Sequence, residues 1–239
     1  MATLDRLELY LRAQLASMRT PAEVAVQPAI RPFVTISRQA GAGGHSLAGA
    51  MLERFSAQAD KELFGDWQVF DQKLCRMVAE DPMFTQSLDS LLAEEYRRPA
   101  NDLFHQVLRS TVDQDLVMTH VFQLVHALAS VGKAIIVGRG ASQVTRGMSP
   151  GVRLRVVAPD EQRITRLMEL LDLSERRAKA EMRKVDTGRA RLVRSHFGVD
   201  IDDPLEYDAV WNTGGATLEE IADATISLLQ CRVAATRPA

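Results

Sequence analysis

Three glycines close together, Gly41, Gly43 and Gly44, mark the part of this 239-residue chain that is best suited to bind phosphate. They follow an alternating apolar segment, residues 33–37, which is typical of a buried strand. A helical pattern of apolar residues begins just after them. A glycine-rich turn between a strand and a helix lets the backbone fold closely around an anion, and free N–H groups at the start of the helix point toward it. The alternative is a turn that binds no ligand.

The loop departs from the usual phosphate-loop pattern G-x-x-x-x-G-K-[ST] at its lysine. Gly44 stands at the lysine position, and Ser46 lies one position later than the usual hydroxyl. The lysine normally neutralises the β- and γ-phosphates. Arg38 is a fixed cation at the mouth of the loop, whereas a neutral His45 adds little charge at pH 7. The predicted nucleotide-binding residues are Arg38, Gly41, Ala42, Gly43, Gly44, His45 and Ser46.

A second group of residues suited to phosphate chemistry lies in residues 153–197, which hold twelve Arg or Lys and seven Asp or Glu. The segment therefore carries a net charge of +5 in a chain whose total is −2. The planar guanidinium of arginine holds two phosphate oxygens at once, so several arginines can neutralise phosphates during transfer. The alternative is a solvated helix face that is stabilised by neighbouring opposite charges.

The elements that must position these residues alternate between strand and helix. Strands are predicted over residues 33–37, 67–70, 133–137, 152–157 and 207–212, with a polar turn over residues 60–66. Helices are predicted over residues 3–19, from the glycine loop to residue 59, and over residues 72–79, 84–96, 102–130, 159–170, 175–195 and 217–233. Ser174 is expected to cap the seventh of these helices, and a capping box over residues 217–220 opens the last one.

This order predicts an α/β fold in which a mainly parallel sheet carries helices on both faces. Residues 72–132 contain no strand signal, so an all-helical insert is expected between two strands. Asp71 directly follows the second strand and Arg139 follows the third. Because the carboxyl ends of parallel strands meet at one edge, we expect residues 41–46, Asp71 and Arg139 to converge there.

The bulk composition narrows the class of protein. The chain is 46% hydrophobic and 25% charged, which is ordinary for a soluble globular protein. A net charge of −2 gives no overall attraction to nucleic acid or to an anionic membrane, so neither is an expected partner. No apolar run is long enough to span a membrane, and the N-terminus lacks the plan of a signal peptide. We therefore expect a cytoplasmic protein.

The first 32 residues are expected to form a separate N-terminal segment. Leucines and a methionine recur at steps of three and four in residues 3–19, which predicts an amphipathic helix. The apolar face of that helix has two open uses, which are packing on the body of the protein and pairing with a second copy as a homodimer. Residues 20–32 contain three prolines and are expected to form a linker.

Five short motifs resemble the cytidylate kinase-like family, a branch of the nucleoside monophosphate kinases. They are ISRQAGAGG (residues 36–44), VFD (69–71), IVGRG (136–140), VDTGR (185–189) and YDAVWNT (207–213), and they occur in the family's order. The resemblance implies a three-layer, parallel-sheet P-loop kinase core over residues 33–70 and 131–233. It further implies an all-helical acceptor-binding insert at 71–130 and an arginine-bearing helical lid at about 172–200, which leaves 234–239 as a tail.

The resemblance also implies substrates and roles. ATP with Mg²⁺ would be the phosphoryl donor, and CMP or dCMP would be the acceptor. Arg163, Asp186 and Arg189 would be catalytic, because the two arginines would close on the transferred phosphate and Asp186 would orient them. Asp71 and Arg139, with Arg76, would bind the acceptor, and Ser46 would lie near the metal.

Four positions differ from the family pattern, and they keep other functions open. Gly44 replaces the loop lysine and Gly140 replaces an aspartate. Gln72 replaces a serine, and Met182 replaces an arginine of the lid, although Arg183 is adjacent. Without the lysine, the protein could be a nucleotide-binding regulatory protein with little or no turnover, since that charge matters more in the transition state than in ground-state binding. A changed acceptor pocket could instead accept a different small molecule.

Overall fold

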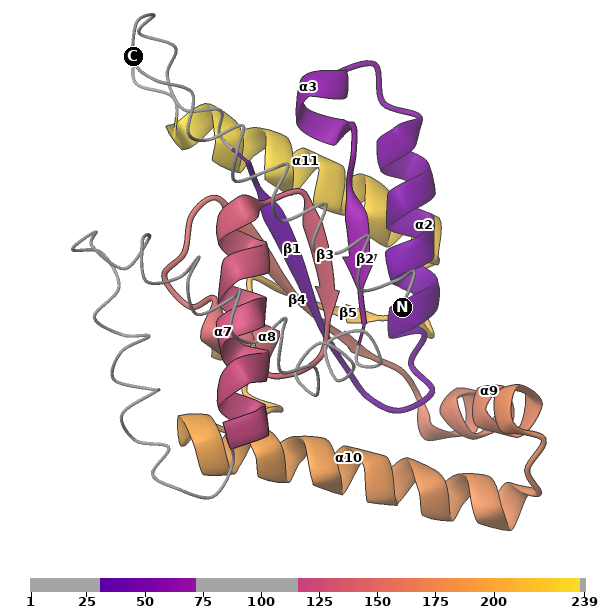
Figure 1. Ribbon diagram of the computed structural model, residues 1–239. Helices are drawn as coiled ribbons and strands as arrows, with labels where there is room; N and C mark the ends of the chain where they lie inside the picture. The colour runs from indigo at the N-terminus through magenta and orange to yellow at the C-terminus, as the bar shows by residue number, and fades with distance from the viewer. Residues whose placement is uncertain (1–30, 72–115, 237–239) are drawn as a thin grey trace, which may run out of the picture.

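Five parallel strands form the centre of the protein in the computed structural model, which describes residues 31–71 and 116–236 (Figure 1). The strands are β1 (Phe33–Arg38), β2 (Gln68–Phe70), β3 (Ala134–Val137), β4 (Gly151–Val157) and β5 (Ala209–Asn212). Their order in the sheet is β2-β3-β1-β4-β5, and every pairing is parallel. The predicted α/β class is confirmed, and β1 lies in the middle of the sheet.

Helices cover both faces of this sheet, as the predicted three layers require. Helices α2 (Gly44–Ser56) and α11 (Leu218–Thr236) pack on one face, and α7 (Leu116–Val131) and α8 (Ala141–Val144) pack on the other. Successive strand side chains point to opposite faces, so Ile135 and Val137 join the α2 side while Ala134 and Ile136 join the α7 side. The central strands β1, β3 and β4 are buried at most positions, which explains why apolar residues predominate in them, whereas the edge strand β5 exposes Val210.

A helical hairpin closes the carboxyl edge of the sheet. Helix α9 (Asp160–Leu171) is followed by the long helix α10 (Glu175–Phe197), which runs across the ends of the strands at the bottom of Figure 1. Ile164 and Leu167 of α9 pack with Ala178 and Met182 of α10 around Ala40, which belongs to the glycine loop. The hairpin is therefore anchored to the loop by its own small apolar core.

Three local details differ from the sequence prediction. The predicted turn at residues 60–66 contains a short helix, α3 (Lys61–Phe64), because Asp60 caps it and two apolar side chains are buried beneath it. Ser174 lies at the start of α10 but makes no capping hydrogen bond, whereas Thr217 and Glu220 form the predicted capping box. Helix α11 continues to Thr236, three residues beyond the predicted end, and these three residues are exposed.

Some predictions fall on residues that the structure does not describe. These are the N-terminal helix and most of its linker, the helices at 72–79 and 84–96, the start of the helix at 102–130, Gln72, Arg76 and the last three residues. Within residues 31–71 and 116–236, no helix is both long enough and apolar enough to cross a membrane.

Candidate active site

The glycine loop connects the central strand β1 to helix α2, as the sequence predicts. Gly43 precedes the helix with a φ of 86°, a left-handed conformation that glycine adopts without strain. No side chain caps α2, and His45 and Ser46 in its first turn are exposed. The first amides of a helix have no partner within the helix, so this end is suited to bind an anion.

The carbonyl groups of the loop are held by side chains from the second half of the protein. Arg163 Nε donates to the Ala40 carbonyl at 2.8 Å, and Arg166 Nη1 donates to that of Gly41 at 2.9 Å. Arg189 Nη1 binds the Arg38 carbonyl at 3.1 Å, and Thr213 Oγ1 binds that of Ala42 at 2.9 Å. In a planar trans peptide the C=O and N–H point in opposite directions. The bonds to the Ala40 and Ala42 carbonyls therefore orient the following amides, those of Gly41 and Gly43, away from Arg163 and Thr213.

The three residues predicted to be catalytic come together beneath this loop. Asp186 accepts a hydrogen bond from the Ala40 amide at 2.7 Å and forms an ion pair with Arg163. Arg189 lies 3.9 Å from the same carboxylate. Arg163 is 4% exposed, and it donates to Asp160 as well as to Asp186 and Ala40. The guanidinium of Arg163 is therefore engaged by protein groups in this structure, rather than directed at an open phosphate site.

Arg38, the last residue of β1, is buried at the junction of two turns. It is 8% exposed, its aliphatic stem lies over Gly44, and its guanidinium lies against Gly138. Burial, together with the nearby guanidinium groups of Arg189 and Arg139, lowers the pKa of Arg38 to about 9. Arg38 is therefore still protonated at neutral pH.

His45 does not supply a charge to the loop at neutral pH. Partial desolvation of the His45 ring and the neighbouring charge of Arg38 lower the pKa of His45 below its ordinary value of 6.5. Asp71, at the end of β2, acts in the opposite direction and raises the pKa of both His45 and Arg38. Asp71 thus lies at the same edge as the loop, as predicted.

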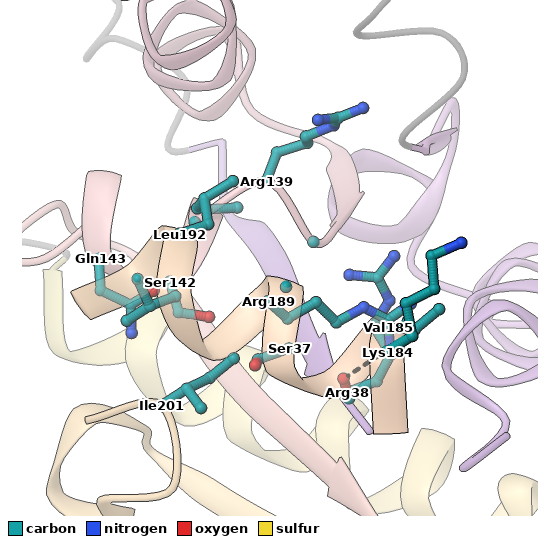
Figure 2. A pocket seen from close by; sticks show the side chains of 15 residues that line it. Ser37, Arg38, Arg139, Ser142, Gln143, Lys184, Val185, Arg189, Leu192 and Ile201 are labelled. Atoms are coloured by element: carbon teal, nitrogen blue, oxygen red, sulfur yellow. Dashed lines mark hydrogen bonds between the residues drawn. The ribbon is translucent and has the colours of Figure 1, made fainter. Parts of the chain in front are cut away.

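A cavity of about 410 Å³ lies beside the loop, between the ends of β1 and β3 and helix α10 (Figure 2). Ser37 and Arg38 line it from β1, the turn after β3 lines it with Arg139 to Gln143, and α10 contributes Arg189 and the apolar side chains of Val185, Leu192 and Val193. Arg139 has a φ of 58°, and Figure 2 shows its side chain extending away from α10. Arg38 and Arg139 therefore border one cavity.

Several contacting residues were not identified from the sequence. Arg166 lies three residues after Arg163, and this helical spacing places both on one face toward the loop. Thr213 is the last residue of the YDAVWNT motif (207–213), but no role could be assigned to it from the sequence. No motif in the sequence marks Gln143 as a site residue. It is 7% exposed on the cavity wall, and its Nε2 has no partner among the described residues.

The residues at this edge fit a nucleoside triphosphate with its Mg²⁺. The triphosphate would be held by the uncapped amides of α2. A Cβ on Gly41, which has a φ of 74°, would lie 2.5 Å from the backbone carbonyl oxygen of Arg163, so glycine is needed for the loop to be this compact. Mg²⁺ usually needs few protein oxygens because phosphates and water complete its shell. Ser46 and Asp71 carry oxygens of the required kind at this edge.

Comparisons with known proteins agree with this architecture. The sequence profile of the cytidylate kinase-like family matches residues 33–215. No curated protein matches the sequence. The crystal structure of an uncharacterized protein from Eubacterium ventriosum superimposes with a TM-score of 0.61 at 18% identity, over 84% of this chain and 100% of that chain. Shikimate kinase from Bacteroides thetaiotaomicron gives a TM-score of 0.43 at 14% identity, over 83% and 98% of the two chains.

Proposed function

This chain belongs to the cytidylate kinase-like family, and from that premise we propose that it transfers a phosphoryl group from ATP to CMP, dCMP or a related small acceptor. One observation carries the proposal furthest. Neighbouring strands β1 and β3 end in two turns suited to anions, the uncapped glycine loop and the turn that carries Arg139. A donor phosphate on the first turn and an acceptor phosphate on the second would lie side by side.

On the donor side, the loop amides bind the β- and γ-phosphates. Arg163 and Thr213 orient the amides of Gly41 and Gly43, because they bind the carbonyls of the preceding residues. ATP with Mg²⁺ supplies the activated phosphoryl group, and Ser46 with Asp71 would hold the metal. The prearranged amides need no reorganisation when charge develops during transfer, which is the main source of stabilisation in such sites.

On the acceptor side, Arg139 binds the monophosphate and the cavity receives the rest of the molecule. Asp71, and Arg76 from the insert, complete the predicted acceptor site. Arg189 stabilises the oxygens of the transferred phosphate, and Asp186 orients it through their contact. Phosphoryl transfer needs positioning and charge neutralisation more than a strong base, and this set of residues supplies both.

The α9–α10 hairpin excludes water from the transferred group. Its anchoring on Ala40 brings Arg189 to the loop and closes one side of the cavity. Excluding water limits wasteful hydrolysis of the donor and strengthens every charged contact inside the site. These effects favour an enzyme, whereas a protein that only binds nucleotide would not need them.

The first experiment is a coupled assay of ADP release with CMP, dCMP, UMP and AMP, and with no acceptor as the control. We expect release that depends on a pyrimidine monophosphate and on Mg²⁺. Calorimetric binding of ATP without turnover would support the regulatory alternative that Gly44 keeps open. Turnover only with another hydroxyl compound would support a different acceptor, to which Gly140 and Gln72 would have adapted the pocket.

A further inference from the structure

We propose that Arg38 supplies the cation that a phosphate-binding loop normally takes from its lysine, and that its guanidinium binds the phosphate held between the two turns. This inference rests on the proposed function for the identity of the phosphate compound, but the anion site itself can be tested separately. Three observations carry it, and they concern space, position and charge.

The space for Arg38 is provided by two glycines that are far apart in the sequence. A Cβ on Gly44 would lie 2.8 Å from Cγ and 2.9 Å from Cβ of Arg38, closer than real Cβ atoms come to such neighbours. A Cβ on Gly138 would lie 2.7 Å from the central carbon of the Arg38 guanidinium. The stem of Arg38 thus occupies the space that a side chain at position 44 would need. A lysine at position 44 and the present conformation of Arg38 exclude each other.

Arg38 lies between the glycine loop and the turn that carries Arg139, where one cation can bind a phosphate on either turn. Its stem crosses the first residue of α2, at the anion-binding end of the helix, and its guanidinium reaches the residue that opens the Arg139 turn. The two turns are adjacent because β1 pairs with β3, and the Gly138 amide binds the Ile36 carbonyl at 3.0 Å. Arg38 also lines the cavity beside the loop (Figure 2). A guanidinium here can reach an anion on either turn.

The charge of Arg38 distinguishes it from the other buried arginines in the described part of the chain. Arg155 is 3% exposed and Arg163 is 4% exposed, and each has an ion pair with a carboxylate. Arg38 has no such pair within the described residues, and its Nε is buried without a hydrogen-bond partner there. After burial, the guanidinium groups of Arg189 and Arg139 have the largest effect on its pKa and lower it, and the carboxylates of Asp71 and Asp186 oppose them more weakly. A buried cation beside two others requires an anion for its compensation.

The test uses Arg38→Met, which keeps the aliphatic stem and removes the charge. The probe is inorganic tripolyphosphate, titrated by calorimetry without Mg²⁺ and without acceptor. A charge-assisted contact of this kind predicts an affinity roughly ten- to a hundred-fold weaker in Arg38→Met than in the wild type. Arg38→Lys, which keeps the charge and loses the planar fork, is expected to bind with intermediate affinity.

The matched control is Arg54→Met. Arg54 lies near the far end of α2 and pairs with Asp223 at 2.8 Å on the surface, so this variant removes the same charge without touching the loop. It should bind tripolyphosphate as the wild type does. A second measurement is the melting temperature. Tripolyphosphate at one fixed concentration should raise it equally in the wild type and in Arg54→Met, and should raise it less in Arg38→Met.

The outcomes separate this inference from the proposed function. Equal tripolyphosphate affinity in Arg38→Met and the wild type, or no binding by the wild type, would overturn the inference. Suppose that Arg38→Met binds tripolyphosphate more weakly than the wild type, and that the wild type phosphorylates none of the acceptors. This pair of results would support the inference and contradict the kinase proposal. Full turnover of CMP by Arg38→Met would support the kinase proposal and would show that Arg38 does not bind the reacting phosphates.

Discussion

At the scale of single residues, the contact of Arg38 with Gly44 explains why a glycine stands at the lysine position of the loop. In the sequence, a glycine at the lysine position suggests a loop that has lost its charge. In the structure the same glycine leaves room for a buried arginine, and Gly138 on the neighbouring strand does the same at the other end of that side chain. Gly44 and Gly138 together therefore make the space that the side chain of Arg38 occupies.

This relation predicts an unusual response to alanine. Gly44 lies in the first turn of α2, where glycine to alanine normally stabilises a helix by up to about 1 kcal/mol. Because the new Cβ would meet Arg38, we expect Gly44→Ala to lower the free energy of unfolding by about 1–3 kcal/mol. In an Arg38→Gly background the obstructing atoms are absent, and the same change should be stabilising. Urea unfolding of the four proteins measures both effects as a double-mutant cycle.

Gly49→Ala provides the control for this experiment. Gly49 lies on the same helix, is exposed, and has open space within 4 Å of the position where its Cβ would lie. We expect this substitution to stabilise the protein in both backgrounds. If Gly44→Ala behaved like Gly49→Ala in the wild type, Arg38 would not occupy the space that the structure assigns to it.

At the scale of elements, the α9–α10 hairpin acts as a brace for the loop between β1 and α2. Arg163, Arg166 and Asp186 all bind backbone atoms of residues 40 and 41. The positive charge of this segment is therefore used in part to hold main chain, and only the remainder is available to phosphates. Arg189 is placed for both uses, because it binds the Arg38 carbonyl and also lines the cavity. Burial lowers the pKa of Arg189, and Asp186 opposes this shift.

Because Arg163 holds the loop in place, we expect Arg163→Met to lower both the stability of the protein and its affinity for tripolyphosphate. The substitution leaves the Ala40 carbonyl without its donor and removes the ion pair of Arg163 with Asp186. We expect the free energy of unfolding to fall by about 2–4 kcal/mol, with weaker binding of tripolyphosphate, because the loop is less ordered. Arg177→Met, on the exposed face of α10, should change stability by no more than about 0.5 kcal/mol. Equal stability of the two variants in urea would contradict the bracing role.

At the scale of the whole molecule, one carboxylate joins the sheet to the last helix. Asp208 accepts hydrogen bonds from the backbone of Arg153 at 2.7 Å and from its side chain at 3.1 Å. It also pairs with Arg232 of α11 at 3.0 Å. Burial alone would raise the pKa of Asp208, but the hydrogen bonds from Arg153 and Arg232 outweigh it, so that the pKa is lowered below its ordinary value. The last strand and α11 are thereby fastened to the edge of the sheet.

This lowered pKa predicts part of the acid sensitivity of the fold. A carboxyl whose folded pKa lies below its unfolded value contributes stability above about pH 4, and loses it as pH falls through the folded pKa. Asp208→Asn should lower the free energy of unfolding by about 1–2 kcal/mol at pH 7. The variant should also lose less stability than the wild type on acidification, which urea unfolding at neutral and acid pH measures. Asp223→Asn, in an exposed pair with Arg54, should leave both values near those of the wild type.

The sequence by itself determined the class of fold and, in residues 31–71 and 116–236, the order of the strands. The five strands were predictable because β-branched and apolar runs at positions 33–37 and 133–137 are local signals, and the glycines at 41, 43 and 44 mark the turn that must follow β1. The short helix α3 was missed, because burial of Phe64 depends on partners elsewhere in the chain. The exact end of α11 was missed, because its last three residues are exposed and continue no apolar pattern. The acceptor, the metal, the N-terminal homodimer and the roles of Arg76 and Arg139 remain predictions.

Only the tertiary structure decided how the site is built. Local periodicity extends over a few residues, whereas the contact between Arg38 and Gly138 exists because β1 pairs with β3 across a hundred residues of chain. In the same way, Arg163 was predicted to close on the transferred phosphate and Asp186 to orient that arginine, and packing of the hairpin on Ala40 directs both side chains to the loop backbone. Side-chain types record which chemistry is possible, and long-range packing determines which partner each side chain has.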